Sequence, residues 1–192
     1  MRNHMWIFLS AMLINNFTLV MFLGLCSFLG VTNKVSTAVR LGLADTFVLV
    51  ITSVSVTILN KWILTTAPYL RIVAFIIVIA SMVQIAEMAV KKWSPKLFRE
   101  LGIYLPLITT NCAMLGFAIF QTNRGYSFAE GLTFSIGAGM GLTLALVLMA
   151  SIREKLELAD VPTIARGTAV VLIIAGALSM AFMGFGGLMS GG

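Results

Sequence analysis

Charged side chains are scarce in this chain, and their scarcity excludes most soluble classes of protein. Only 10% of the 192 residues are charged, whereas about 25% is usual in soluble domains. Hydrophobic residues make up 59% of the chain, and the mean hydropathy is +1.03. The net charge of +6 comes from basic residues spread through short polar segments, without the stacked aromatics of a nucleic-acid surface. The sequence therefore predicts an integral membrane protein that contacts the lipid bilayer and binds no nucleic acid.

Residues that build catalytic sites are also rare. The one histidine, His4, has no second metal ligand near it in the sequence, and we expect it to lie at the membrane interface. Gly137, Gly139 and Gly141 lie in an apolar run with neither a strand before them nor a lysine after them, so they do not form a phosphate loop. They favour close helix packing instead. We find no nucleotide fingerprint and no paired carboxylates, so we expect no catalytic site in this chain alone.

Cysteine is nearly absent, and the two that occur are placed alike. Cys26 and Cys112 each lie in a long apolar run beside glycine and asparagine, residues that tend to interrupt a helix. A buried thiol is usually a small packed hydrophobe, and two thiolates are too few for a four-thiolate iron–sulfur site. A matched pair, one in each half of the chain, favours a redox or metal site that another subunit completes. Two packed thiols are the alternative.

Long apolar runs divide the chain into six expected membrane spans. A span needs roughly 20 apolar residues, and the first run continues to Val31 without a cleavage site, so we expect a retained first span. Three prolines fall in or beside connections, and Pro106 predicts a kink or break inside the fourth span. The expected spans are 5–30, 39–60, 69–90, 101–121, 128–151 and 167–189, and the connection prolines are Pro68, Pro95 and Pro162.

Basic residues are distributed unequally between the two sides of this arrangement. Six spans place both termini on one side of the membrane. The side of the first, third and fifth connections carries nine Lys or Arg, and the other side carries four. The positive-inside rule then predicts that the nine are cytoplasmic and that both termini are external. The nine are Lys34, Arg40, Lys91, Lys92, Lys96, Arg99, Arg153, Lys155 and Arg166, and the four are Arg2, Lys61, Arg71 and Arg124.

Weak internal similarity divides the chain into two three-span halves, 1–93 and 94–192. Because three is odd, the halves cross the membrane in opposite senses, and such inverted repeats often hold functional sites on broken helices near the midplane. We therefore expect an all-α membrane protein of two inverted three-helix repeats, with helix breaks in spans one and four. The matches pair Leu13-Ile14 with Leu107-Ile108, and Arg71, Ala74, Ile79 and Ala80 with Arg166, Ala169, Ile174 and Ala175.

Polar residues inside the expected spans have two possible roles. Those near the breaks either hydrogen-bond the exposed backbone or line an ion path, and we favour the first role because polar groups join helices in membranes. Asp45 and Glu87 are the acids nearest the membrane interior, where an acid is a functional hypothesis by default. Arg40 and Lys91 lie close to them in sequence, so we expect local ion pairs near the cytoplasmic interface, with ion handling as the alternative. The residues near the breaks are Asn15, Asn16, Thr109, Thr110 and Asn111.

Several segments, among them Asn15-Asn16-Phe17 and Phe22-Leu23-Gly24-Leu25-Cys26, form a recognisable set. They resemble the signature stretches of the RnfA/RnfE and NqrD/NqrE family of membrane subunits. The resemblance runs along essentially the whole chain and is specific. The Asn-Asn-Phe and Thr-Thr-Asn-Cys segments and the short connection from Lys61 to Arg71 are closer to the RnfA type than to the NqrE type. The segments are Asn15-Asn16-Phe17, Phe22-Leu23-Gly24-Leu25-Cys26, Leu105 to Ala113, Ile152-Arg153-Glu154-Lys155, Asp160-Val161-Pro162 and Ala181 to Phe185.

The resemblance implies a role for this chain. In this family two homologous six-span subunits pack in opposite orientation, and each gives two cysteines to an intramembrane [2Fe-2S] centre, a role that falls on Cys26 and Cys112. The resemblance also implies an Rnf complex of the bacterial or archaeal inner membrane, whose other subunits carry flavin and iron–sulfur centres. Such a complex couples electron flow between ferredoxin and NAD to sodium or proton translocation. This chain is then a non-autonomous subunit with an RnfE-like partner.

Three other functions are open at this point. One is an NqrE-type subunit of a sodium-translocating NADH:quinone reductase. Another is a small transporter, since inverted repeats with broken helices describe many of those. The third is a passive assembly subunit with structural cysteines. The cysteine pair favours electron transfer over the last two, and the lack of an obvious charged substrate pocket weakens the transporter hypothesis.

Overall fold

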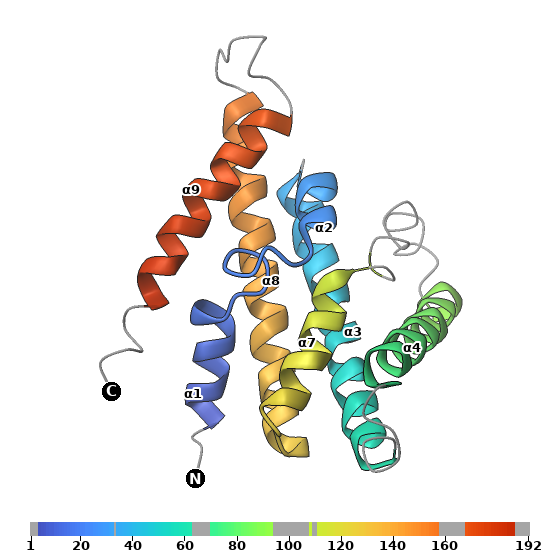
Figure 1. Ribbon diagram of the computed structural model, residues 1–192. Coiled ribbons are helices and arrows are strands. Elements are labelled where there is room, and N and C mark those ends of the chain that lie inside the picture. The colour runs from blue at the N-terminus through green and yellow to red at the C-terminus, as the bar shows by residue number, and fades with distance from the viewer. Residues whose placement is uncertain are drawn as a thin grey trace.

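A computed structural model describes residues 4–32, 34–62, 70–93, 108, 111–157 and 168–186. All regular structure in these residues is helical, which confirms the expected all-α class. The elements are α1 (His4–Leu9), the π-helix η1 (Ser10–Ile14), α2 (Leu25–Val31), α3 (Val35–Trp62), α4 (Arg71–Trp93), α7 (Cys112–Asn123), α8 (Phe128–Glu157) and α9 (Thr168–Gly186), arranged as in Figure 1.

Helices α3 and α8 form the centre of the molecule and share its most extensive helix contact. The contact is close because a glycine on each helix meets a threonine on the other. A Cβ on Gly42 would lie 2.5 Å from Thr143 Oγ1, and a Cβ on Gly139 would lie 2.6 Å from Thr46 Oγ1. Thr46 and Thr143 each donate the hydroxyl to the carbonyl four residues earlier, at 2.7 Å and 2.8 Å. Small residues thus let two apolar helices pack backbone against backbone.

Two further glycines of α8, Gly137 and Gly141, face α1 and η1. A Cβ on Gly137 would lie 2.8 Å from the Phe8 carbonyl oxygen, and one on Gly141 would lie 2.7 Å from that of Met12. Any larger side chain would push the N-terminal helix off α8. The prediction that Gly137, Gly139 and Gly141 serve close helix packing is therefore confirmed.

Residues 15–24 separate η1 from α2 and cross in front of α8 as a loop (Figure 1). The Asn16 side chain bonds both the backbone of this loop and the backbone of α8. Its Oδ1 accepts from the backbone N–H groups of Thr18 and Leu19, at 3.1 Å and 3.3 Å, and its Nδ2 donates to the Gly141 carbonyl at 2.8 Å. Asn16 is only 1% exposed, so these bonds satisfy backbone groups that have no access to water.

A cluster of aromatic rings packs beneath the interruption. Phe17, from the loop, meets the rings of Phe117, Phe120 and Phe134 edge-on, with centroids 5.9–6.3 Å apart. Phe117 and Phe134 stack at 5.2 Å. Because these rings come from the loop, α7 and α8, the cluster holds the interrupted segment against both helices.

Helices α4 and α9 lie at the periphery and expose apolar side chains, such as Ile77 (60%) and Met180 (71%). Two described helices, Val35–Asn60 and Phe128–Leu156, are long and apolar enough to cross a membrane. The shorter apolar helices are His4–Ile14, Ile72–Ile85 and Ala169–Phe185. These features agree with an integral membrane protein. The six-span topology and the inverted halves 1–93 and 94–192 stay predictions.

Some expected features lie outside the described residues. They are all four prolines, Thr109 and Thr110, the fourth span before Asn111 apart from Ile108, and the basic residues Arg2, Lys96, Arg99 and Arg166. The proposed break in span four therefore stays a prediction on its N-terminal side.

Alanine in place of Gly42 tests the central helix contact. The added Cβ would lie 2.5 Å from Thr143, and overpacking of this kind typically costs about 1–3 kcal/mol. We expect Gly42→Ala to lower the thermal unfolding midpoint of the purified protein in detergent, followed by circular dichroism.

Gly176→Ala on α9 is the matched control, because a Cβ there meets no atom of the described residues within 4 Å. Adding Thr143→Gly to Gly42→Ala removes the clash and should restore part of the lost stability. Equal unfolding midpoints for Gly42→Ala and Gly176→Ala would contradict the close contact between α3 and α8.

Candidate functional site

Both cysteines lie at the start of a helix and face outward. Cys26 is the second residue of α2, and Cys112 is the first residue of α7. Both are free thiols, and both are exposed on the surface of this chain. They are therefore not packed core residues of the chain, and a ligand or a partner subunit can reach both sulfurs.

The segments that carry the two cysteines are in direct contact. The backbone N–H of Gly24, two residues before Cys26, donates to Cys112 Sγ at 2.9 Å. Gly24 has a φ of +81°, a left-handed conformation that favours glycine. A Cβ at this position would also lie 3.1 Å from Asn111 Oδ1. The glycine thus lets the turn before α2 approach the start of α7, and the sequence offered no sign of this contact.

Asn111 caps the helix that Cys112 begins. Its side-chain oxygen accepts from the backbone N–H of Ala113 at 3.0 Å, the pattern of an N-cap residue. Asn15, at the end of η1, donates to Ser10 Oγ at 2.9 Å. The predicted role of the asparagines in satisfying backbone at the interruptions is confirmed for Asn16 and Asn111, and Asn15 bonds a side chain instead.

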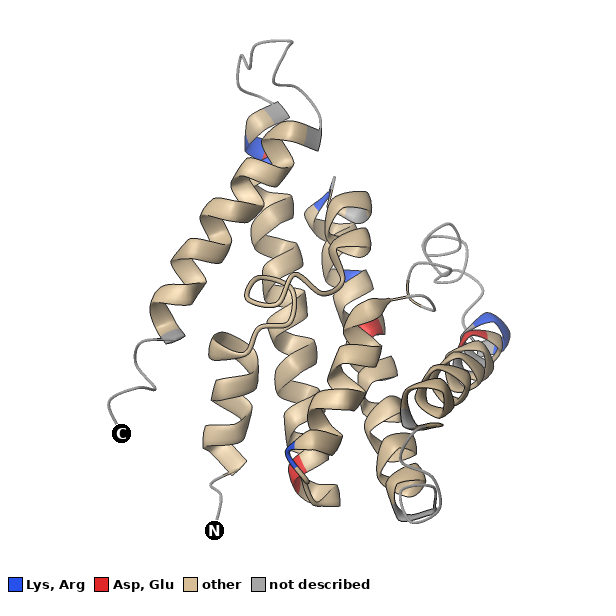
Figure 2. Cartoon of the chain, viewed as in Figure 1, with Lys and Arg blue, Asp and Glu red and all other residues tan. Residues whose placement is uncertain are grey.

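Asp45 lies deep inside the molecule rather than at its edge. It is 0% exposed, and neither carboxylate oxygen has a hydrogen-bond partner among the described residues. The Asn111 side chain lies beside it, and Figure 2 shows the acidic segment of α3 next to the start of α7. The expectation of an interfacial ion pair for Asp45 is therefore wrong, because the side chain faces the α3–α7 contact. Glu87 is half-buried on α4, one turn before Lys91, and its pairing stays a prediction.

A second polar cluster lies at the other end of α7. Gln121, only 2% exposed, donates to the Ser53 carbonyl at 3.3 Å and to Thr57 Oγ1 at 3.2 Å. Asn60 donates to Thr122 Oγ1 at 3.1 Å. These bonds join α3 to α7, and the polar residues within two apolar helices were the sequence signal for them.

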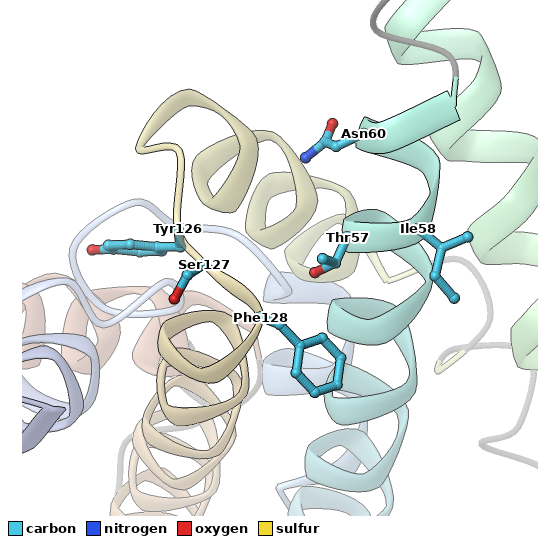
Figure 3. A pocket seen from close by; sticks show the side chains of 6 residues that line it. All are labelled: Thr57, Ile58, Asn60, Tyr126, Ser127 and Phe128. Carbon is cyan, nitrogen blue, oxygen red and sulfur yellow. The ribbon is translucent and has the colours of Figure 1, made fainter.

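A pocket of about 510 Å³ adjoins this cluster at the end of α3, and Figure 3 shows Thr57 and Asn60 projecting from α3 beside the turn into α8. The described residues that line it include no charged residue and no cysteine, so they offer no ligand for iron. The lining residues are Thr57, Ile58, Asn60, Tyr126, Ser127 and Phe128.

The donor set at the cysteines fits half of a metal site. Across the described part of the chain, no group of three or more His, Cys, Asp or Glu is placed to hold a metal ion. His4 is exposed, and its ring Nδ1 lies 3.4 Å from Thr133 Oγ1. Cys26 and Cys112 therefore lack further ligands from their own described surroundings, and their exposure leaves room for ligands from another chain.

Comparison with known proteins agrees with the resemblance seen in the sequence. The chain matches the family described as "Rnf-Nqr subunit, membrane protein" over residues 4–189. It is 52% identical over 193 residues to a protein of Syntrophotalea carbinolica that is named as the A-type subunit of an ion-translocating oxidoreductase complex, with 100% of each chain covered. Proteins of the same name from Shigella flexneri serotype 5b and Escherichia coli O1:K1 are 50% identical over 191 residues, with 98% of this chain and 99% of theirs covered.

These relatives extend over the full chain and are A-type subunits, as the segments around Asn15 and Cys112 predicted. Their names describe subunits of a redox complex that moves ions. The chain therefore belongs to the Rnf–Nqr family of membrane subunits.

Proposed function

We propose that this chain is an electron-transfer subunit of an ion-translocating ferredoxin:NAD oxidoreductase complex. Cys26 and Cys112 supply two of the four thiolates of a [2Fe-2S] cluster, and a homologous inverted subunit of the RnfE type supplies the other two. The observation that carries this proposal is the bond from the Gly24 N–H to Cys112 Sγ. That bond brings the two cysteine-bearing segments together on an exposed surface.

The residues around the sulfurs suit an iron–sulfur group. Such clusters are held by thiolates, and hydrogen bonds to their sulfurs help to set the reduction potential. The Gly24 N–H already points at Cys112 Sγ. Cys112 also begins a helix of 12 residues, whose positive N-terminal end favours negative charge on the sulfur. When bound, a [2Fe-2S] group supplies one-electron transfer at membrane depth.

This chain contributes position rather than catalysis. Gly24 and Asn111 fix the start of α2 and α7, and the aromatic cluster around Phe17 packs the interrupted segment against α7 and α8. We assign no catalytic site to this chain alone.

The alternatives are weaker after these observations. The full-length relatives are A-type subunits of an ion-translocating oxidoreductase, which favours this complex over an NqrE-type reductase subunit. A transporter has no use for two exposed thiols on segments joined by a backbone bond, and structural cysteines are buried in most proteins. We place the complex in the cytoplasmic membrane of a bacterium or archaeon, where its other subunits carry flavin and iron–sulfur centres.

The orientation in the membrane follows from charge. In Figure 2 basic segments lie at the end of the molecule where α3 begins and α8 ends, and α1 begins at the opposite end. Further basic segments lie at the end of α4 and at the turn after α7. The described basic residues at the first end include Lys34, Arg40, Arg153 and Lys155. The positive-inside rule makes this end cytoplasmic.

A reporter fused after Gly192 tests this orientation. Alkaline phosphatase, which is active only outside the cytoplasm, should be active at this position. A green fluorescent protein fused at the same place should stay dark after export in unfolded form. Bright fluorescence together with an inactive phosphatase would reverse the assignment.

Serine in place of either cysteine tests the ligand role. Serine keeps the size of the side chain but is a much poorer ligand for iron than a thiolate. In the assembled complex, Cys26→Ser and Cys112→Ser should lower iron content, the EPR signal of the cluster and ferredoxin-dependent NAD reduction. The loss should exceed the about 10–100-fold cost typical of removing an outer partner of a metal ligand.

Met180→Ser is the matched control, since it also replaces an exposed sulfur-bearing side chain in an apolar helix with serine. It should leave all three measurements unchanged. Membrane insertion of the cysteine variants should also be normal, because six apolar spans do not depend on one thiol. A double cysteine mutant that assembles and retains full activity would refute the ligand role.

A separate experiment tests the need for a partner. The chain purified alone should carry no stoichiometric [2Fe-2S] cluster, because it supplies two thiolates and a complete site needs four. Coexpression with the homologous E-type subunit should restore about one cluster for each pair of chains, measured as iron and acid-labile sulfide. A full cluster in the monomeric chain would disprove the shared site.

A further inference from the structure

Helix α2, which carries Cys26, is too short to be stable without contacts to the rest of the protein. It has seven residues and spans roughly 10 Å at 1.5 Å per residue. Helices of this length are not stable by themselves. Its N-cap, Gly24, offers no side-chain hydrogen bond. Phe28, in the middle of α2, is 1% exposed and packs in the core. The depth and rotation of the helix, and with them the position of the Cys26 thiol, then depend on what holds its two ends.

Arg153 of α8 holds the C-terminal end of α2. Its Nη1 donates to the Leu29 carbonyl at 3.0 Å and to Thr32 Oγ1 at 2.9 Å. Thr32 is 0% exposed and donates its own hydroxyl to the Phe28 carbonyl at 2.7 Å. The guanidinium thus takes up a carbonyl of the last turn, where the helix supplies no partner of its own. Its positive charge also complements the negative end of the helix dipole.

The next residue of α8 holds the start of α3. The backbone N–H of Val35 donates to Glu154 Oε1 at 3.0 Å. Arg153 therefore bonds the end of α2, and Glu154 bonds the start of α3. Because α8 also packs closely against α3, these hydrogen bonds fix the connection between α2 and α3 to the central pair of helices.

We propose that Arg153 is a positioning residue for Cys26. The guanidinium sets the depth and rotation of α2, so that the Cys26 sulfur lies at a fixed distance from Cys112. At the other end of α2 the Gly24 N–H bonds Cys112 Sγ, so the short helix is held between α7 and Arg153. This role rests on the proposed function and deepens it, since it concerns the geometry of the two thiolates that face the cluster.

The two native cysteines make the claim directly measurable. Nitroxide labels attached to Cys26 and Cys112 in the full chain, purified alone in detergent, report their separation through dipolar broadening of the EPR spectrum. Arg153→Gln removes the two bonds and the charge, and it should widen the distribution of distances between the labels. Arg153→Lys keeps the charge but not the planar fork, and it should widen the distribution as well.

Lys155→Gln is the matched control, because Lys155 is an exposed cation two residues further along the same helix. It should leave the distribution of distances unchanged. Thr32→Val removes one of the two acceptors of Arg153 and leaves the rest of the contact in place. Thr32→Val should give a distance distribution of intermediate width. It replaces Arg153→Gln as the test if that variant does not fold.

In the assembled complex, Arg153→Gln should also lower cluster occupancy about tenfold, the scale of an outer-shell change, and alter the EPR line shape of the remaining cluster. An unchanged distance distribution in Arg153→Gln, Arg153→Lys and Thr32→Val would overturn the positioning role. A wild-type complex without iron would instead refute the proposed function, and the label distances would still decide the role of Arg153.

Discussion

A backbone that leaves the helical conformation inside an apolar protein must find hydrogen-bond partners within the protein, and much of this structure follows from that constraint. The chain interrupts its first apolar run at residues 15–24. Backbone N–H groups there donate to Asn16 Oδ1 and to the sulfur of Cys112, and the Asn16 side chain in turn donates to a carbonyl of α8. Glycines at these contacts allow the elements to approach closely. The interrupted segment can therefore bond neighbouring helices only because glycines let those helices come close.

The same arrangement brings the two cysteine-bearing segments together. A continuous helix would satisfy its own backbone and leave no N–H free to meet a sulfur. The interruption frees the Gly24 N–H, and α7 begins at Cys112 with its side chain exposed. The result is two exposed thiols, one of which accepts a hydrogen bond from a backbone N–H. In our proposal the chain builds half of a four-thiolate site, and membership of a family of complex subunits explains where the other half comes from.

The sequence predicted the class of protein, the family and the packing role of Gly137, Gly139 and Gly141, because composition and glycine spacing report directly on apolar helices. It also predicted the backbone role of Asn16 and Asn111. It did not predict contacts between distant residues, such as that of Gly24 with Cys112 or of Arg153 with α2, because no periodicity encodes them. The ion pair expected for Asp45 failed for the same reason. A separation of five residues from Arg40 along a helix says nothing about which neighbouring helix covers the side chain.

The central claim is that Cys26 and Cys112 are iron ligands at the surface where this chain meets a homologous subunit. Alkylation of the intact complex with a membrane-permeant maleimide, followed by mass spectrometry of the peptides, tests it most directly. We expect both thiols to be protected in the intact complex and to react fully once iron is removed by a chelator under reducing conditions. Rapid alkylation of both cysteines in the intact, iron-loaded complex would contradict it.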